Sequence, residues 1–164
     1  VTYFVEIIHN ATRQAQEFCV GAYPKNGAKR LVLFSLIMEH WRENYGQINA
    51  GTSLFTDSSA PHPVAEELSR HWLEFHIEAF ELCKDRGELR KGLTPLDAAE
   101  IIVVTNLGAT FFGHLFRDES DDVKPLRFLR KALRSVGVPR ADKITNRVLR
   151  DHHHCLPAPA AVAL

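Results

Sequence analysis

The chain has 164 residues and is 45% hydrophobic, which is enough for one compact domain with a sizeable core. Its formal net charge is zero, so the overall charge favours neither a nucleic acid nor an anionic membrane surface as partner. The charge is nevertheless uneven, because residues 124–164 hold 9 Lys and Arg against 2 Asp and Glu, whereas residues 1–123 are acidic. This asymmetry is typical of a nucleic-acid-binding arm or of a basic helix that faces solvent or an acidic body, and we favour the helix.

The cysteines indicate the cellular compartment of the chain, and the first residue indicates whether upstream sequence is missing. Cys19, Cys83 and Cys155 are far apart and form no CxxC pair, which favours free thiols in a reducing, cytoplasmic compartment. No signal peptide is visible. The chain begins at Val1 and its only methionine is Met38, so we expect a fragment, a processed product or a trimmed chain.

Apolar residues recur every three or four positions over residues 1–21, which predicts an amphipathic helix. No capping residue precedes this helix, which again suggests missing upstream sequence. The same spacing predicts long helices over residues 28–45 and 63–86. Between them we expect a short helix over residues 47–55 and an exposed connector over residues 56–63, where turn-forming residues are dense.

The next stretch carries the clearest local signals. Gly87 is a candidate helix C-cap. Thr94 is a candidate N-cap, with Pro95 at the first helical position and the carboxylate of Asp97 at the third. These signals predict that a helix begins at Thr94, and the apolar pattern extends it to residue 116.

This helix is unusually apolar, because residues 101–116 include no charged side chain. A helix that is apolar on nearly every face must be covered on nearly every face. The run is shorter than the ~18 residues of a membrane span, so we predict no membrane partner. Gly108, Ala109 and Gly113 form a cluster of small residues that would let a second helix approach closely, either from a second chain or from this one.

The C-terminal part is basic and ends in a low-complexity segment. A charged loop is predicted over residues 117–124 and a helix over residues 124–136, and residues 141–150 add a turn or two of helix. The residues beyond look like a flexible tail. Without strand alternation or a repeat of fixed period, the predicted class is all-α, with one domain over residues 1–137 and a partly disordered tail over residues 138–164.

Chemically reactive patterns are scarce. The chain has no nucleophile elbow, P-loop or dinucleotide fingerprint. Residues 152–155 read HHHC and have metal-ligand types, but they are consecutive in the predicted tail, where binding would be adventitious. His71 and His76 are five positions apart and miss the four-residue spacing that places two ligands on one helical face. We therefore predict no enzyme activity, no metal and no cofactor.

Large aromatic side chains gather on the inward faces of the three middle helices, with a few polar groups among them. This combination is typical of an apolar pocket for a hydrophobic or aromatic small molecule, and a solid core is the competing interpretation. Asn106 lies in the middle of an apolar helix and needs a hydrogen-bond partner if it is buried. The predicted ligand-binding residues are Phe34, Met38, Trp41, Trp72, Phe75, His76, Phe80, Asn106 and Phe112.

The order of these elements, and above all GELRKGLTPLDAAE at residues 87–100, resembles the C-terminal ligand-binding and dimerisation domain of TetR-family transcriptional regulators. The family often shows a G-x-[LI]-R-x-[GD]-x-[DTS]-P-x-x-[AL]-A pattern at this point, before the helix that begins its dimeric four-helix bundle. The small residues and phenylalanines of GATFFGHLF, residues 108–116, are also typical. The resemblance covers residues 1–137 and implies a bundle of five to six helices.

The resemblance also implies a function. VTYFVEIIHNATRQAQEF at residues 1–18 looks like the helix that links the family's N-terminal helix-turn-helix to the ligand-binding domain. The implied protein is a homodimeric repressor that senses a small molecule and contacts DNA only through a helix-turn-helix that this chain lacks. The implied interface uses the helices over residues 94–116 and 125–136, with Gly108, Ala109, Gly113, Phe116, Leu126, Leu129 and Leu133. The alternative is a free-standing helical dimer that acts as a scaffold or interaction module.

Overall fold

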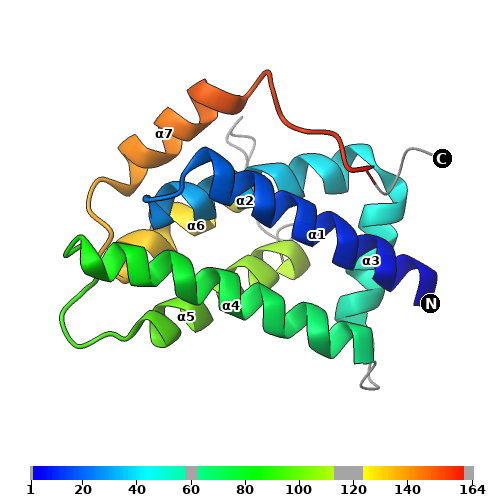
Figure 1. Ribbon diagram of the computed structural model, residues 1–164, viewed down its shortest axis with the longest axis horizontal. Coiled ribbons are helices and arrows are strands. Elements are labelled where there is room, and N and C mark those ends of the chain that lie inside the picture. The colour runs from blue at the N-terminus through cyan, green and yellow to red at the C-terminus, as the bar shows by residue number, and fades with distance from the viewer. Residues whose placement is uncertain (1, 58–62, 113–123, 161–164) are drawn as a thin grey trace.

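The computed structural model describes residues 2–57, 63–112 and 124–160. Within these ranges the chain forms seven α-helices and no strand, which confirms the all-α class (Figure 1). The helices are α1 (Thr2–Ala22), α2 (Gly27–Asn44), α3 (Gly46–Asp57), α4 (Pro63–Asp85), α5 (Pro95–Phe112), α6 (Lys124–Ser135) and α7 (Ala141–His152). Most of the predicted connector and charged loop, and the last residues of the helix predicted to reach residue 116, lie outside the described residues.

Local sequence fixes the ends of α4 and α5 as predicted. The hydroxyl of Thr94 accepts a hydrogen bond from the backbone N–H of Asp97 at 3.1 Å, and the Asp97 carboxylate accepts from the N–H of Thr94 at 2.8 Å. This reciprocal capping satisfies two donors that a helix start leaves open. At the end of α4, Gly87 adopts φ +69° and donates its N–H to the carbonyl of Lys84, so glycine ends the helix without strain.

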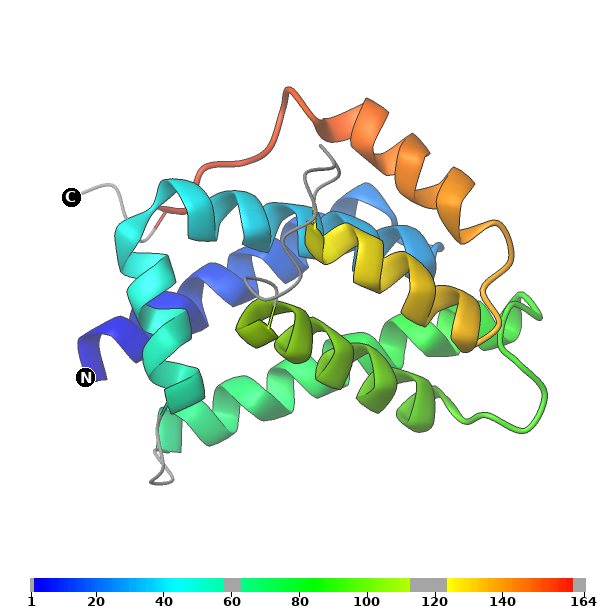
Figure 2. The same ribbon diagram turned by 180° about the vertical axis from the view of Figure 1, so that it is seen from behind.

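Helix α2 is the element that the others surround. It contacts α1, α3, α4, α6 and α7. Figures 1 and 2 show α1 and α6 on opposite sides of it. Its side chains are accordingly buried on most faces, including Leu31, Val32, Leu33, Phe34, Leu36, Ile37 and Trp41. A helix covered in this way loses more apolar surface to the core than the amphipathic helices around it.

Helices α2 and α4 meet closely at one end and diverge toward the other. At Gly27, the first residue of α2, an added Cβ would overlap the backbone carbonyl of Ala79 on α4, so the two backbones touch there. At the opposite end, α3 lies between the end of α2 and the start of α4 (Figure 2). The two helices therefore form a wedge that widens toward α3. Phe34 and Trp72 face each other across this wedge with ring centres 6.3 Å apart.

Helix α5 packs on α4 and α6 but keeps part of its apolar surface exposed. Ala98, Ala99 and Ile102 are buried, whereas Val104 is 68% exposed and Leu96 is 44% exposed. The sequence predicts cover on nearly every face of this helix, and residues 2–57, 63–112 and 124–160 cover only part of it. Apolar surface of this kind on an ordered helix is available to a partner.

Residues 138–160 pack on the helical body, whereas the sequence predicts a partly disordered tail over residues 138–164, of which the last four lie outside the described residues. Helix α7 contacts α2 and α6. Beyond it, residues 153–160, the C-terminal strap, run back beside the body (Figure 1). Trp41 donates from Nε1 to the carbonyl of Pro157 at 2.6 Å, and the Gln14 amide makes two hydrogen bonds to strap backbone groups. The strap supplies the partner of the indole N–H of Trp41, a fully buried residue, and the partly exposed Gln14 amide holds the strap at a second point.

Candidate functional site

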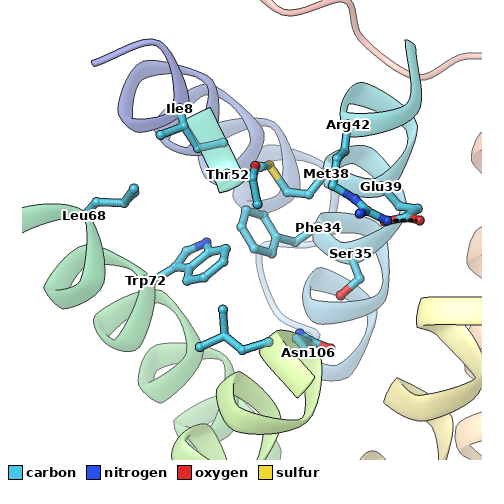
Figure 3. Close-up of a pocket in the computed structure, with 11 residues that line it drawn as sticks. Ile8, Phe34, Ser35, Met38, Glu39, Arg42, Thr52, Leu68, Trp72 and Asn106 are labelled. Carbon is cyan, nitrogen blue, oxygen red and sulfur yellow. Dashed lines mark hydrogen bonds and ion pairs between the residues drawn. The ribbon is translucent and has the colours of Figure 1, made fainter. Parts of the chain in front are cut away.

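A pocket lies where the wedge between α2 and α4 widens (Figure 3). Its volume is about 70 Å³, and its walls come from five helices, α1 to α5. The lining residues are Ile8, Phe34, Ser35, Met38, Glu39, Arg42, Thr52, Leu68, Trp72, Asn106 and Leu107. A cavity that holds one water needs about 10–15 Å³ on this kind of measure, so the pocket has room for a small organic molecule.

Apolar and aromatic side chains form most of the wall. The ring of Phe34 stands edge-on to Trp72 and also packs against Phe75, with ring centres 5.0 Å apart. Met38 and Leu68 extend the apolar surface toward α3 and α1 (Figure 3). Aromatic walls of this kind provide large contact area for a flat apolar ligand at little entropic cost, because few side-chain torsions need fixing.

The polar groups sit at restricted points of the pocket. On α2, the Arg42 guanidinium and the Glu39 carboxylate form a forked ion pair with N–O distances of 2.6 to 3.0 Å. Because each charge neutralises the other, the rim favours a neutral or weakly polar occupant over an ion. Ser35 and Asn106 add a hydroxyl and an amide that can orient a polar group on such an occupant.

Four of the nine predicted ligand-binding residues, Phe34, Met38, Trp72 and Asn106, line this pocket. The structure brings them together from α2, α4 and α5, as the facing of these three helices predicts. The side chain of a fifth, Phe112, lies outside the described residues. The structure therefore places four of the predicted side chains around one pocket, at one end of the bundle.

The other four predicted residues, Trp41, Phe75, His76 and Phe80, are buried in the core and do not line the pocket. For the three residues of α4 the reason is the wedge, since only the first turns of α4 reach the point where α2 has moved away. Trp41 lies on α2 and is directed toward the C-terminal strap, where its Nε1 donates to the carbonyl of Pro157. His76 donates from Nδ1 to the carbonyl of Trp72 at 2.7 Å, which fixes its neutral tautomer. Burial lowers the pKa of His76 to about 4, and the hydrogen bond to the Trp72 carbonyl opposes this shift only in part. His76 is therefore a neutral core group rather than a group that orients a ligand.

Sequence reasoning missed the polar side of the pocket. One face of α2 carries Ser35, Glu39 and Arg42 together with the predicted pocket residue Met38, at spacings of three and four residues. That spacing from Met38 is the sequence feature from which they could have been predicted. Glu39 and Glu43 are four residues apart on one face of α2, a pattern that by itself is typical of a solvated surface. The ion pair with Arg42 makes it part of a pocket rim instead.

The residues predicted for a dimer interface fall into three groups. Gly108 and Ala109 are partly exposed on α5, and an added Cβ at Gly108 would meet no atom within 4 Å. Gly113 and Phe116 lie outside the described residues. The three leucines of α6 are buried within the single chain, because they form the face with which α6 packs on α2 and α5; they are Leu126, Leu129 and Leu133. Their side chains are therefore core, and a partner helix would meet other residues.

A second cluster of side chains lies between α1 and α4, away from the pocket. His9, Glu67 and His71 each place one ligand atom within 4.8 Å of the others, and no other group in the described ranges has both the residue types and this spacing. Burial lowers the pKa of His9, and the Glu67 carboxylate opposes that shift. The sequence did not reveal this cluster because its two histidines are on different helices.

Comparisons of the chain with protein-family models, with curated proteins and with solved structures find no match. None of the helices in the described residues is both long enough and apolar enough to cross a membrane.

Proposed function

We propose that this chain is the effector-binding and dimerisation part of a TetR-like transcriptional repressor that senses a small hydrophobic or aromatic molecule. The observation that carries the proposal is that α1 shares the pocket with the helical body, since Ile8 of α1 faces Trp72 and Phe34 across it (Figure 3). In the family that the sequence resembles, the helix at this position links the ligand-binding domain to the DNA-binding helix-turn-helix. A molecule in the pocket would contact the linking helix and the body at once.

Such a shared wall couples occupancy to the position of α1. A ligand shifts a conformational equilibrium only through its different affinities for the two arrangements. A molecule that fits between Ile8 and Trp72 when α1 is in one position loses those contacts when α1 moves. In a dimer, the positions of the two linking helices set the spacing of the DNA-binding units, which must match half-sites about one DNA turn apart or a multiple of it.

The pocket also indicates the class of effector. Its walls are mainly apolar, its only charged residues pair with each other, and its uncharged polar groups are few. An uncharged aromatic or aliphatic molecule with one or two hydrogen-bonding groups fits this arrangement, whereas a phosphorylated or strongly anionic molecule does not.

The proposed homodimer would form on the exposed side of α5. Val104 and Leu96 supply exposed apolar area, and the open space beside Gly108 admits a closely packed partner helix. A stable interface needs to bury more than ~1,000 Å² in total, which requires further contacts on either side of this strip.

Thermal shift with a library of neutral aromatic and aliphatic compounds tests the ligand-binding part of the proposal. We expect some compounds to raise the melting temperature of the parent chain, because a ligand that binds only the folded state stabilises it. The effect should disappear in Trp72→Ala and persist in Ile77→Ala. The second variant is the control, because Ile77 is a partly buried residue of the same helix outside the pocket.

Two results would count against this function. A library that stabilises no form of the chain would remove the effector, and a shift that survives in Trp72→Ala would place the binding site elsewhere. In the first case a dimer without a ligand would favour the scaffold or interaction module, which needs the exposed side of α5 but not the pocket.

Light scattering at micromolar concentration tests the dimer. We expect a dimeric parent, and Gly108→Leu should shift it toward monomer because the new side chain occupies the space that the partner helix needs. Gly21→Leu is the matched control, since a side chain at Gly21 on α1 also meets no atom within 4 Å. A monomeric parent, or two variants with equal mass, would contradict the proposed interface.

A further inference from the structure

The cluster between α1 and α4 is held by regular helices rather than by loops. His71 lies four residues after Glu67, so both side chains project from the same face of α4. His9 meets them from α1, with its ring 5.5 Å from that of His71, centre to centre, in an edge-on arrangement. Two packed helices therefore fix three potential ligands from two directions, which favours a defined geometry over a flexible one.

Both histidines keep a buried nitrogen without a partner. The Nδ1 atoms of His9 and His71 are inaccessible to solvent, and neither has a hydrogen-bond partner within the described part of the chain. Buried polar atoms are almost always satisfied, and exceptions call for a bound species or a functional reason. Two exceptions on neighbouring rings, with a carboxylate beside them, point to one species that serves all three side chains.

The site is open to solvent on one side. A cleft of about 150 Å³ borders it, lined by Glu6, His9, Asn10 and Glu67. Glu67 is exposed, so an ion could enter from the cleft and meet the carboxylate first. Glu6 lies one turn before His9 on α1 and offers a second carboxylate from the same cleft.

The ligand types select among metals. Two imidazole nitrogens and one carboxylate suit Zn²⁺ and its transition-metal neighbours, whereas Ca²⁺ and Mg²⁺ prefer oxygen ligands throughout. Zinc binds such ligands at about 2.0–2.2 Å in a tetrahedron, which places the ligand atoms about 3.3 Å apart. The three atoms lie within 4.8 Å of one another, so small side-chain rotations bring them into coordination. The fourth position faces the cleft, where water or Glu6 can occupy it.

We propose that His9, Glu67 and His71 bind a divalent transition-metal ion, with Zn²⁺ as the first candidate, and that this ion joins α1 to α4. The site differs from the prediction of no metal because its ligands come from two helices. It is separate from the proposed effector pocket, whose lining includes none of the three residues. The proposal therefore stands or falls independently of the effector.

The consecutive histidines of the C-terminal part would confuse a simple binding measurement. His153, His154 and Cys155 are exposed and offer ligands of their own. The measurement therefore uses the full chain with His153→Ala, His154→Ala and Cys155→Ala as the background. After chelator treatment, this background is titrated with Zn²⁺ against a chromophoric chelator, and separately with Co²⁺, whose visible absorption reports nitrogen and oxygen coordination.

We expect one equivalent of Zn²⁺ per chain and a Co²⁺ spectrum typical of four or five ligands. Glu67→Gln and His71→Gln should each weaken Zn²⁺ binding by at least about tenfold, since even the loss of an outer-shell partner has an effect of this size. His40→Gln should bind as the background does, because His40 is a partly exposed histidine on α2 outside the cluster.

Circular dichroism of the metal-free variants checks that they fold. Glu67 is exposed, so Glu67→Gln keeps the fold even if a change at a buried histidine does not, and it then decides the matter alone. The proposal is overturned if the background shows no saturable binding. It is equally overturned if Glu67→Gln binds Zn²⁺ less than about tenfold more weakly than the background does.

Discussion

The two halves of α4 have the same amphipathic pattern and different environments. In the C-terminal half, residues 73–85, the inward side chains are fully enclosed: Phe75, His76, Ala79, Phe80 and Cys83. In the N-terminal half, residues 63–72, Leu68 and Trp72 border the pocket, the exposed Glu67 borders the cleft, and His71 keeps a buried Nδ1 without a hydrogen-bond partner in the described residues. One helix thus supports the core with one half and both candidate sites with the other.

At the pocket, the cause of the difference is the angle between α2 and α4 rather than the residues themselves. Where Gly27 touches Ala79 the helices are in backbone contact, and aromatic rings fill what remains. Toward α3 the helices separate, and the same types of side chain no longer fill the space. Ligand sites in helical proteins form where packing cannot close, so stability and binding are divided along the helix.

The largest expected effect tests the enclosed half. Phe80→Ala should lower the free energy of unfolding by ~3–5 kcal/mol, because Phe80 is fully buried and its removal leaves a cavity. Urea denaturation of the purified chain measures the change. A loss no larger than that of Trp72→Ala would break the distinction between the two halves.

The second effect is a pH dependence that belongs to the same half. Folding holds the pKa of His76 at about 4, below its ordinary value of 6.5, because the charged ring would be buried. The unfolded chain therefore binds more protons than the folded chain between these values. The contribution of neutral His76 to the free energy of unfolding is therefore fully present above pH 6.5. It falls by about 3 kcal/mol as the pH drops toward 4.

Urea denaturation at several pH values detects this loss, with His76→Leu as the comparison. The variant cannot bind the proton and should show a correspondingly weaker dependence over the same interval. Parallel curves for parent and variant would mean that other groups cause the acid sensitivity, and the enclosed half would lose its most specific signature.

Truncation of the pocket wall should have a smaller effect. Trp72→Ala should cost less than ~3 kcal/mol, the lower limit for a fully enclosed aromatic ring, because one part of Trp72 already borders the pocket. The same urea titration gives the value. A cost at or above that limit would mean that the pocket closes in solution and that Trp72 belongs to the core.

The smallest effect sharpens the comparison at the cleft. In metal-free protein, Glu67→Gln should change the free energy of unfolding by less than about 0.5 kcal/mol, because Glu67 is exposed. Saturating Zn²⁺ should then raise the melting temperature of the parent above that of this variant. Equal melting temperatures with the metal would indicate that the ion binds elsewhere.

Local signals in the sequence predicted the helices and their ends well. Thr94 with Asp97, and Gly87 after α4, act within a few residues, so their effect is visible without the fold. The apolar pattern also predicts which faces of α2, α4 and α5 point inward, and these faces include Phe34 and Trp72 at the pocket. These features depend only on helical periodicity and on which faces are apolar.

Features that depend on how whole helices are placed were not predictable. Trp41 and Phe80 are large aromatic residues like Phe34 and Trp72, and only the placement of whole elements separates them: Phe80 lies next to the close contact of α2 with α4, and Trp41 contacts the C-terminal strap. The low complexity of residues 153–160 predicts a tail, because it shows nothing of the hydrogen bonds between the C-terminal strap and Trp41 and Gln14. His9 and His71 are distant in sequence, and only the crossing of α1 and α4 brings them together.

The hydrogen bond from Trp41 to Pro157 has a consequence for the order in which the chain folds. Trp41 belongs to the central helix, yet the partner of its buried donor is 116 residues further along the chain. During synthesis, which proceeds N-terminus first at about 5–20 residues per second, α2 waits several seconds for that partner. Over this interval the helix exposes the surface that α7 and the strap later cover. The late arrival of these residues thus creates a period in which exposed apolar surface favours aggregation of the nascent chain, and a truncation that removes both α7 and the strap would leave that surface uncovered.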